Sequence, residues 1–477
     1  MTRARLSLVV AALFGALVAA APASAQDPSG SCNLAGTQGT KQTYDCRYGP
    51  IKVAPFQVLT KEIQLDMPKP DVDGFVTNME TDVVEADGTP IPISRLMLHH
   101  IVFSRLGVQD RTCSTFRMWD SMTEIPAAAE RFYAAGEERA KMAVPDGYGY
   151  PIKKQDNWLV TYMFMNHRSR TDSAHIGYRV TVDTRPDVTP VEPYWLDVEN
   201  CNVDPVYDVA GGRRRGSRNV QQMSWTVPKG GRLIAAGGHV HGGGQTLALT
   251  RPDCGTSGGI YTSRPTWGGP RHPFYNVRPV LHEPGPIHMS GFNSSKGIPL
   301  AAGEKVVLKA NYDAALPHTR VMGIMIAYMA PDPSVTANCG ARPDDMAEAP
   351  APSGRRSPPP FRVPIVGRRG AKAVNIKAPP GRRVRLGRRG TIDVGDLFFR
   401  RPNVTLPAGG TLTWRFEGDT LHNITLANGP RGFSSPNLSQ GRIYRKKLTV
   451  PGTYQLFCGL HPVDMTATVK VVRKRRN

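Results

Sequence analysis

The chain has 477 residues and a formal net charge of +21 at pH 7, and it contains 48 glycines and 42 prolines. Its length suits about three domains, and its few amphipathic helical stretches exclude a mainly helical protein. The basic excess by itself does not indicate nucleic-acid binding, because the pattern of the basic runs does not suggest stacking of bases on aromatic side chains. We therefore expect an all-β, multi-domain protein without a nucleic-acid partner.

The first 25 residues are typical of a secretory signal peptide. Arg3 and Arg5 precede an apolar run, and the sequence ASA at 23–25 is a small-residue cleavage site. The apolar run is short for a membrane span of about 20 residues, although an uncleaved membrane anchor is the alternative interpretation. We expect a secreted, periplasmic or cell-envelope protein whose mature chain starts near Gln26.

Short alternating runs such as KVVLKANY (305–312) and TLTWRF (411–416) predict β-strands through most of the mature chain. The best candidate for a helix is the stretch 126–142. Glycine-, proline- and arginine-rich breaks then predict two tandem antiparallel β-sandwich domains of jelly-roll type, a basic linker and a third β-rich domain. The expected boundaries are 26–209 and 210–345 for the sandwiches, 346–372 for the linker and 373–477 for the third domain.

The linker region carries much of the positive charge. Twelve lysines and arginines and no acidic residue lie between Arg355 and Arg389. Such a run is either simply solvated or attracted to an anionic cell-wall polymer or membrane surface.

The chain has seven cysteines, and an odd number in an exported protein singles one out. If Cys458 binds a metal, six cysteines remain for three disulfides. Cys254 and Cys339 are the preferred pair by neighbourhood, and the other four cysteines would pair within the first domain.

The segment FCGLHPVDM (457–465) places Cys458, His461 and Met465 within eight residues. An electron-transfer copper site uses one thiolate, two imidazoles and a weak axial thioether. Three of these ligands can come from one loop, and the second imidazole then comes from a distant strand. The upstream sequence TLTWRFEGDTLHNITL offers His422 for that role. A C-x-x-H motif alone would also fit half of a zinc site.

With its flanking strands, this part of the chain resembles the cupredoxin (blue copper) family. The resemblance implies a Greek-key β-barrel with copper as cofactor and Asn423 hydrogen-bonded near the thiolate. The type 1 copper ligands that it implies are His422, Cys458, His461 and Met465. One departure is the H-x-x-x-M spacing, which lies between the commoner shorter and longer forms. Laccase-like oxidases are disfavoured, because no histidine flanks the cysteine directly and the chain has one H-x-H pair.

Two further histidine motifs lie in the first two domains. LMLHHIVF contains the adjacent residues His99 and His100. Adjacent residues of a strand face opposite sides, so both can bind one metal only at a distortion or a strand end; one core and one surface histidine is the alternative. AAGGHVHGGG places His239 and His241 two apart, so that both project from one face of a strand.

These motifs, followed by Met322 in HTRVMGIMIAYM, resemble the ascorbate-dependent type II copper monooxygenases, the peptidylglycine and dopamine hydroxylase group. They resemble the plant stress-up-regulated nodulin family more closely still. The resemblance implies a double sandwich with two mononuclear coppers. It assigns His99 and His100 to one copper, and His239, His241 and Met322 to the other.

The third ligand of the first copper is less clear from the pattern. The family position falls on Met163, in the predicted strand NWLVTYMFMNH, and His167 lies four residues later. Either residue would complete the site, or Met163 is an ordinary core residue and the site is degenerate.

Three functions follow from these motifs. The first is an exported copper-binding redox protein that transfers electrons through type 1 copper to an unknown redox partner. The second is a copper- and O2-dependent monooxygenase whose mononuclear coppers receive electrons from the cupredoxin; a fused donor would stay at high local concentration. The third is a structural, envelope-binding protein.

Overall fold

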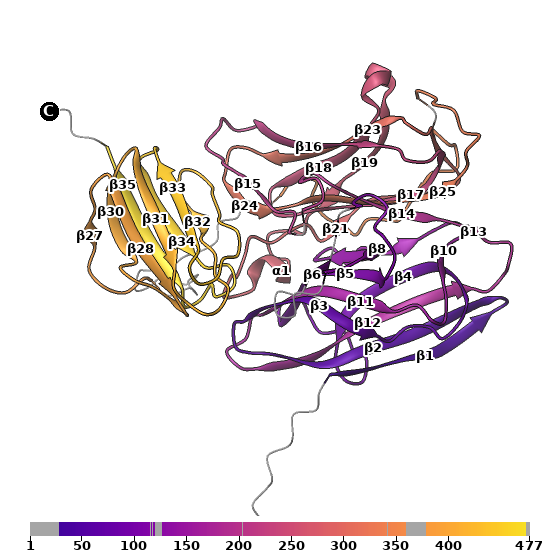
Figure 1. Ribbon diagram of the computed structural model, residues 1–477, viewed down its shortest axis with the longest axis horizontal. Helices are drawn as coiled ribbons and strands as arrows, with labels where there is room; N and C mark the ends of the chain where they lie inside the picture. The colour runs from indigo at the N-terminus through magenta and orange to yellow at the C-terminus, as the bar shows by residue number, and fades with distance from the viewer. Residues whose placement is uncertain are drawn as a thin grey trace, which may run out of the picture.

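The computed structural model describes residues 28–114, 116, 118–119, 126–202, 204–340, 342–358 and 378–473. The expected signal peptide and much of the expected linker lie outside these ranges. The described chain is built almost entirely of strands, arranged in three units (Figure 1), which confirms the predicted all-β class. Among the described residues, we find no helix with the length and apolar character needed to span a bilayer.

The first unit is a sandwich of two mainly antiparallel sheets. The larger sheet has the order β1-β2-β12-β4-β10-β13, with β9 beside β4, and the smaller has the order β3-β11-β5-β8. Along β12 buried and more exposed residues alternate, as expected where one face of a strand points into a core. The strands are β1 (Ser29–Gln38), β2 (Lys41–Val53), β3 (Val58–Met67), β4 (Gly74–Val84), β5 (Leu96–Leu106), β6 (Met118–Trp119), β7 (Pro126–Ala127), β8 (Ala129–Gly136), β9 (Met142–Ala143), β10 (Tyr148–Ile152), β11 (Trp158–Asn166), β12 (Asp172–Asp183) and β13 (Thr189–Pro190).

The predicted helix over 126–142 is wrong, because this stretch forms β7 and β8 and reaches β9. β8 pairs antiparallel with β5 and also contacts two strands of the second sandwich, β14 (Glu192–Asp197) and β25 (Gly323–Pro331). Both of its faces are therefore covered, and Phe132 and its neighbour Tyr133 are 0% and 1% exposed. A strand buried on two faces shows no alternation, and here tertiary packing overrides the helical propensity of alanine and glutamate.

The second unit is another two-sheet sandwich, with the orders β14-β25-β17-β22-β26 and β16-β23-β18-β19. β14 and β15 precede residue 210 in the chain but pair with β25 and β24. The elements are β14 (Glu192–Asp197), β15 (Tyr207–Val209), β16 (Arg218–Thr226), β17 (Gly231–Val240), β18 (Gly244–Thr250), the 3-10 helix η1 (Pro252–Ser257), β19 (Gly259–Ser263), β20 (Pro265–Thr266), α1 (Pro273–Asn276), β21 (His288–Met289), β22 (Gly291–Leu300), β23 (Lys305–Asp313), β24 (His318–Val321), β25 (Gly323–Pro331) and β26 (Ala347–Glu348).

The third unit packs two open sheets, ordered β27-β30-β35-β34-β32 and β29-β28-β31-β33. Its pairing is mixed, since β28 runs parallel to β31 and β30 runs parallel to β35. The strands are β27 (Val384–Arg385), β28 (Arg389–Gly395), β29 (Phe398–Phe399), β30 (Asn403–Pro407), β31 (Gly410–Phe416), β32 (Thr425–Asn428), β33 (Ile443–Leu448), β34 (Gly452–Phe457) and β35 (Thr466–Val472).

The two sandwiches share an apolar core. Residues of β25 such as Ile326 and Tyr328 belong to the same buried cluster as Phe132 of β8. The Tyr328 hydroxyl donates a hydrogen bond to the Phe132 carbonyl oxygen at 2.9 Å. This shared core holds β5 and β8 of the first unit against β17 and β25 of the second.

The third unit contacts the second along β15 and β24, beside which it lies in Figure 1. The Thr319 hydroxyl donates to the Leu426 carbonyl oxygen at 3.0 Å, and the backbone NH of Gly432 donates to the Ala210 carbonyl oxygen at 2.8 Å. The Asp208 carboxylate accepts hydrogen bonds from the backbone and the hydroxyl of Ser434.

Three disulfides are present: Cys254–Cys339, as predicted, and Cys32–Cys46 and Cys113–Cys201. Cys458 is free and buried. Disulfides of this number are typical of exported proteins.

Candidate metal centres

Three donor atoms converge at one end of the third unit. Cys458 Sγ lies 3.8 Å from His422 Nδ1 and 3.7 Å from His461 Nδ1, and the two nitrogens are 3.2 Å apart. The centre of this triangle is within an ordinary metal–ligand bond, about 2.0–2.3 Å, of all three atoms. Met465 is buried in the same core cluster as Cys458. This donor set fits the thiolate, imidazole and thioether chemistry of a type 1 copper site.

Backbone hydrogen bonds hold the loop that carries these ligands. The NH of Cys458 donates to the carbonyl oxygen of Met465, and the NH of Met465 donates to that of His461. Asn423 ties this loop to the segment before β32 that carries His422. Its backbone NH lies 3.4 Å from Cys458 Sγ, and its side-chain oxygen accepts the NH of Gly459 at 2.7 Å. Asn423 therefore contacts both the thiol of Cys458 and the backbone of the ligand loop.

Asp396 is a neighbour of the candidate ligands that the sequence patterns did not point to. Its carboxylate lies 2.9 Å from His422 Nε2, which leaves Nδ1 directed at Cys458. The hydrogen bond from His422 holds the pKa of Asp396 well below its usual range. Burial raises the pKa of the Cys458 thiol and lowers the pKa of His461. A histidine that donates its second nitrogen to a carboxylate is a well-oriented metal ligand.

A second group of histidines lies between the two sandwiches; we call His99, His100, His239, His241 and His282 the histidine cluster. The ring of His99 lies 5.3 Å from that of His100, 5.1 Å from that of His241 and 5.0 Å from that of His282. The rings of His239 and His241 are 5.0 Å apart. The two motifs assigned to separate coppers therefore meet in one continuous cluster.

A bulge in β5 allows the two adjacent histidines to face each other. His100 is paired with Met163 of β11 and Leu98 with Phe164, so His99 has no partner on that strand. The Nδ1 atoms of His99 and His100 lie 3.1 Å apart. A bulge places two residues opposite one and redirects a side chain, which is the distortion that the HH motif needs to act on one site.

Burial and the surrounding histidines keep several of these imidazoles neutral. Burial, aided by His282, holds the pKa of His99 well below 6.5, and burial lowers the pKa of His100 to about 4. Burial also lowers the pKa of His241, with His239 contributing. Neutral imidazoles carry the free lone pair that a metal requires. His239 differs, because the Glu138 carboxylate outweighs burial and raises its pKa.

The other predicted ligands occupy distinct places. Met163 lies opposite His100 and lines both cavities described below. His167 directs Nδ1 to the carbonyl oxygen of Pro279 at 3.0 Å. Among the described residues, no hydrogen bond or ring contact joins His167 to His99 or His100. The geometry thus favours Met163 as the nearer neighbour of the HH pair.

No family model matches the chain. Over 89 residues it is 34% identical to the plastocyanin of Scenedesmus fuscus, which covers 17% of this chain and 91% of that protein. The chain belongs to the cupredoxin family. It is also 30% identical over 74 residues to Amicyanin-alpha of Methylorubrum extorquens, and it spans 62% of that protein's length. A solved purple cupredoxin from Nitrosopumilus maritimus aligns with 17% of this chain and 98% of its own, at 26% identity and a TM-score of 0.16.

These likenesses cover a small part of the chain. We call the third unit, which carries the predicted type 1 ligands, the cupredoxin domain. Next to it, a cavity of about 100 Å³ is lined by residues of all three units. Asn423 and Leu460 line it from the cupredoxin domain, and His99, His241 and His282 line it from the sandwiches. The type 1 loop and the histidine cluster therefore open onto one space.

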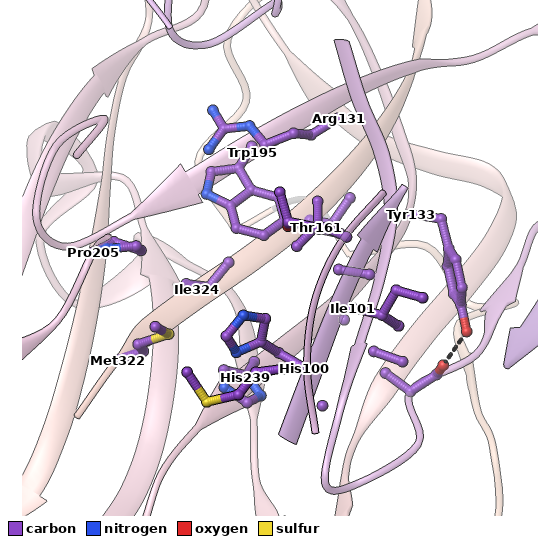
Figure 2. Close-up of a pocket in the computed structure, with 18 of the residues that line it drawn as sticks. His100, Ile101, Arg131, Tyr133, Thr161, Trp195, Pro205, His239, Met322 and Ile324 are labelled. Atoms are coloured by element: carbon purple, nitrogen blue, oxygen red, sulfur yellow. Dashed lines mark hydrogen bonds between the residues drawn. The ribbon is translucent and has the colours of Figure 1, made fainter. Parts of the chain in front are cut away.

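A larger cavity of about 230 Å³ lies between the two sandwiches. Figure 2 shows His100, His239 and Met322 near one end of it, with Trp195 and Arg131 toward the other. Its remaining walls are largely apolar. A mostly apolar space with a few convergent polar groups is the usual form of a small-molecule site.

A path of covalent and hydrogen bonds connects the cupredoxin domain to the histidine cluster. The backbone NH of Asn423 contacts Cys458 Sγ, and three residues further on the Leu426 carbonyl accepts from Thr319. Arg320 follows Thr319 in the chain, and its carbonyl oxygen accepts a hydrogen bond from His241 Nδ1 at 3.0 Å. We call this sequence of bonds the interdomain path.

Proposed function

We propose that this chain is an exported copper protein that transfers electrons through a type 1 site in its cupredoxin domain. The convergence of Cys458 Sγ with the Nδ1 atoms of His422 and His461 carries the proposal. The cofactor is copper, which supplies a one-electron redox couple when bound. The disulfides support export.

The protein's own contribution is a rigid and dry ligand cage. His422, Cys458 and Met465 are each 0% exposed. Asp396 and Asn423 hold the ring and the thiol in position through the hydrogen bonds described above. His461 is the ligand that is partly exposed, so it marks the surface that a redox partner would approach. The chain's own histidine cluster is one candidate partner, and a separate protein is the other.

Copper loading of the full-length protein tests this proposal. We expect an intense visible thiolate-to-copper band and a type 1 electron paramagnetic resonance signal, both lost in Cys458→Ser. His272→Gln, which changes a histidine outside both groups of ligands, serves as the matched control and should keep the band. A fully copper-loaded wild type without the band would overturn the proposal.

A second candidate function is copper- and O2-dependent hydroxylation at the histidine cluster, with electrons supplied by the cupredoxin domain. The larger cavity beside His100, His239 and Met322 and the interdomain path support it. Oxygen uptake with a reductant should then fall in His239→Ala and Met322→Ala while the visible band persists. Oxygen uptake equal to wild type in both variants would overturn the hydroxylation proposal and leave electron transfer as the single proposed function.

The basic linker is proposed to attract an anionic envelope surface, which salt-dependent binding to anionic vesicles would test.

A further inference from the structure

Three side chains from separate elements meet where the sandwiches join. His99 lies on the bulge of β5, Glu137 follows β8, and His282 follows α1 in the second unit. One donor atom from each lies within 4.8 Å of the other two. His99 Nε2 is 3.6 Å from Glu137 Oε1, which also bonds His282 Nε2. The sequence motifs offered only the first of these residues as a ligand.

Glu137 is a buried carboxylate without a permanent cation. Its side chain is 5% exposed, and among the described residues its ion pairs are with histidines alone. Its second oxygen accepts the backbone NH of Gly285 at 2.6 Å, which fixes the carboxylate plane. Burying a carboxylate is costly unless a full positive charge or a metal compensates it. The site thus presents a fixed negative group to any cation placed among the three residues.

The adjoining histidine His241 has its second nitrogen free. Its Nδ1 is held by the Arg320 carbonyl, and its buried Nε2 has no hydrogen-bond partner in the described part of the chain. The His241 ring lies 5.1 Å from that of His99. One ring nitrogen fixed by a carbonyl and the other free is the usual arrangement of a metal-binding histidine.

We infer that His99, Glu137 and His282 bind a divalent transition metal. His241 is the adjacent histidine and lies outside this group of mutually close donor atoms. Two imidazoles and one carboxylate suit Zn²⁺, Cu²⁺ or Fe²⁺. This site is separate from the type 1 centre, uses none of its ligands, and does not rest on the proposed electron transfer. Because its ligands come from both sandwiches, the metal ties the two units together.

The test uses the full-length protein with Cys458→Ser, which removes the type 1 thiolate. The chelated protein is titrated separately with Zn²⁺ and Cu²⁺ by calorimetry, and bound metal is counted after dialysis. We expect metal to bind this background and affinity to fall at least about tenfold when Glu137→Gln is added. Glu283→Gln is the matched control, because Glu283 pairs with His318 at 2.9 Å outside the three-residue site.

His239→Ala in the same background separates this site from the H-x-H site expected from the motifs. It should leave the Glu137-dependent metal bound. Should Glu137→Gln lose its wild-type circular dichroism, His282→Ala replaces it, since that side chain is 16% exposed and lies in a loop. No metal binding in the Cys458→Ser background would overturn the inference. So would equal affinities for the Glu137→Gln and Glu283→Gln proteins.

Discussion

His241 and Arg320 are joined by a hydrogen bond from the imidazole Nδ1 to the backbone carbonyl oxygen, 3.0 Å long. Arg320 also reaches the cupredoxin domain, where its guanidinium donates to the Ser435 carbonyl oxygen at 3.3 Å. One residue of β24 therefore orients a histidine of the cluster and contacts the neighbouring domain. The position of the cupredoxin domain and the orientation of a candidate metal ligand are thus linked.

Thr319→Val should slow electron transfer along the interdomain path. Valine keeps the shape of threonine but loses the hydroxyl that donates to the Leu426 carbonyl. We expect electron transfer from the reduced cupredoxin domain to the copper-loaded histidine cluster to become several-fold slower. The rate is measured by reducing the protein rapidly and recording how fast the visible band returns. Thr411→Val on β31 is the control and should not change the rate. An unchanged rate in Thr319→Val would remove this path from consideration.

Asp396→Asn should weaken copper binding at the type 1 site. Asparagine retains the size of the side chain but replaces the charged carboxylate that accepts a hydrogen bond from His422 Nε2. Loss of such an orienting partner typically lowers metal affinity by about 10–100-fold, measurable by competition with a copper chelator. Asp393→Asn removes a carboxylate paired with Arg415 on the same unit and should have little effect. Similar affinities for the two variants would contradict the orienting role of Asp396.

Asp208→Ala should loosen the cupredoxin domain. The carboxylate accepts the Ser434 backbone NH at 2.6 Å, the Ser434 hydroxyl at 2.8 Å and the Arg320 backbone NH at 3.1 Å. Hydrogen bonds to a charged group contribute about 1.5–3 kcal/mol each, so small-angle scattering should show a larger radius of gyration. Asp204→Ala loses one half-exposed pair with Arg320, worth about 0–1 kcal/mol, and should keep the compact form. The visible band should survive in both.

Asp172→Asn should destabilise the first sandwich in a pH-dependent way. Hydrogen bonds from Arg95, at 2.8 and 2.6 Å, hold the pKa of Asp172 below its usual value. A carboxyl whose pKa is lowered by folding stabilises the folded state. Its contribution is complete above the pKa of the unfolded chain, about 3.9, and is lost as the pH falls through the pKa in the folded protein. In melting experiments on metal-free protein, Asp172→Asn should be less stable than wild type. This difference in stability should be full above about pH 5 and shrink below about pH 4. A deficit that stays constant to low pH would contradict this account.

Local sequence patterns were sufficient for some of these features. The alternating runs 305–312 and 411–416 form β23 and β31. The predicted type 1 ligands Cys458, His461 and Met465 lie within one short stretch. Together with the upstream His422 and the flanking strands, this pattern indicates a metal site. β8 was missed because burial on both faces removes the alternation from which a strand is recognised.

The acidic partners of the histidine cluster had no local signal. Glu137 lies in a stretch that was expected to form a helix, and His282 is 145 residues away in the chain. The sequence pattern does not predict the bulge at His99 either, because the bulge depends on the register of β11 against β5. Only the packing of one sandwich on the other brings these residues together.

Several of the hydrogen bonds that attach the cupredoxin domain have a main-chain acceptor, namely the carbonyl oxygens of Ala210, Leu426 and Ser435. Every amino acid supplies a carbonyl oxygen, so most substitutions at these three positions leave the acceptor in place. Correlated changes between the two domains are therefore expected to be few in related chains. Evolutionary drift can alter the surface chemistry of this junction while the distance between the two groups of candidate ligands is preserved.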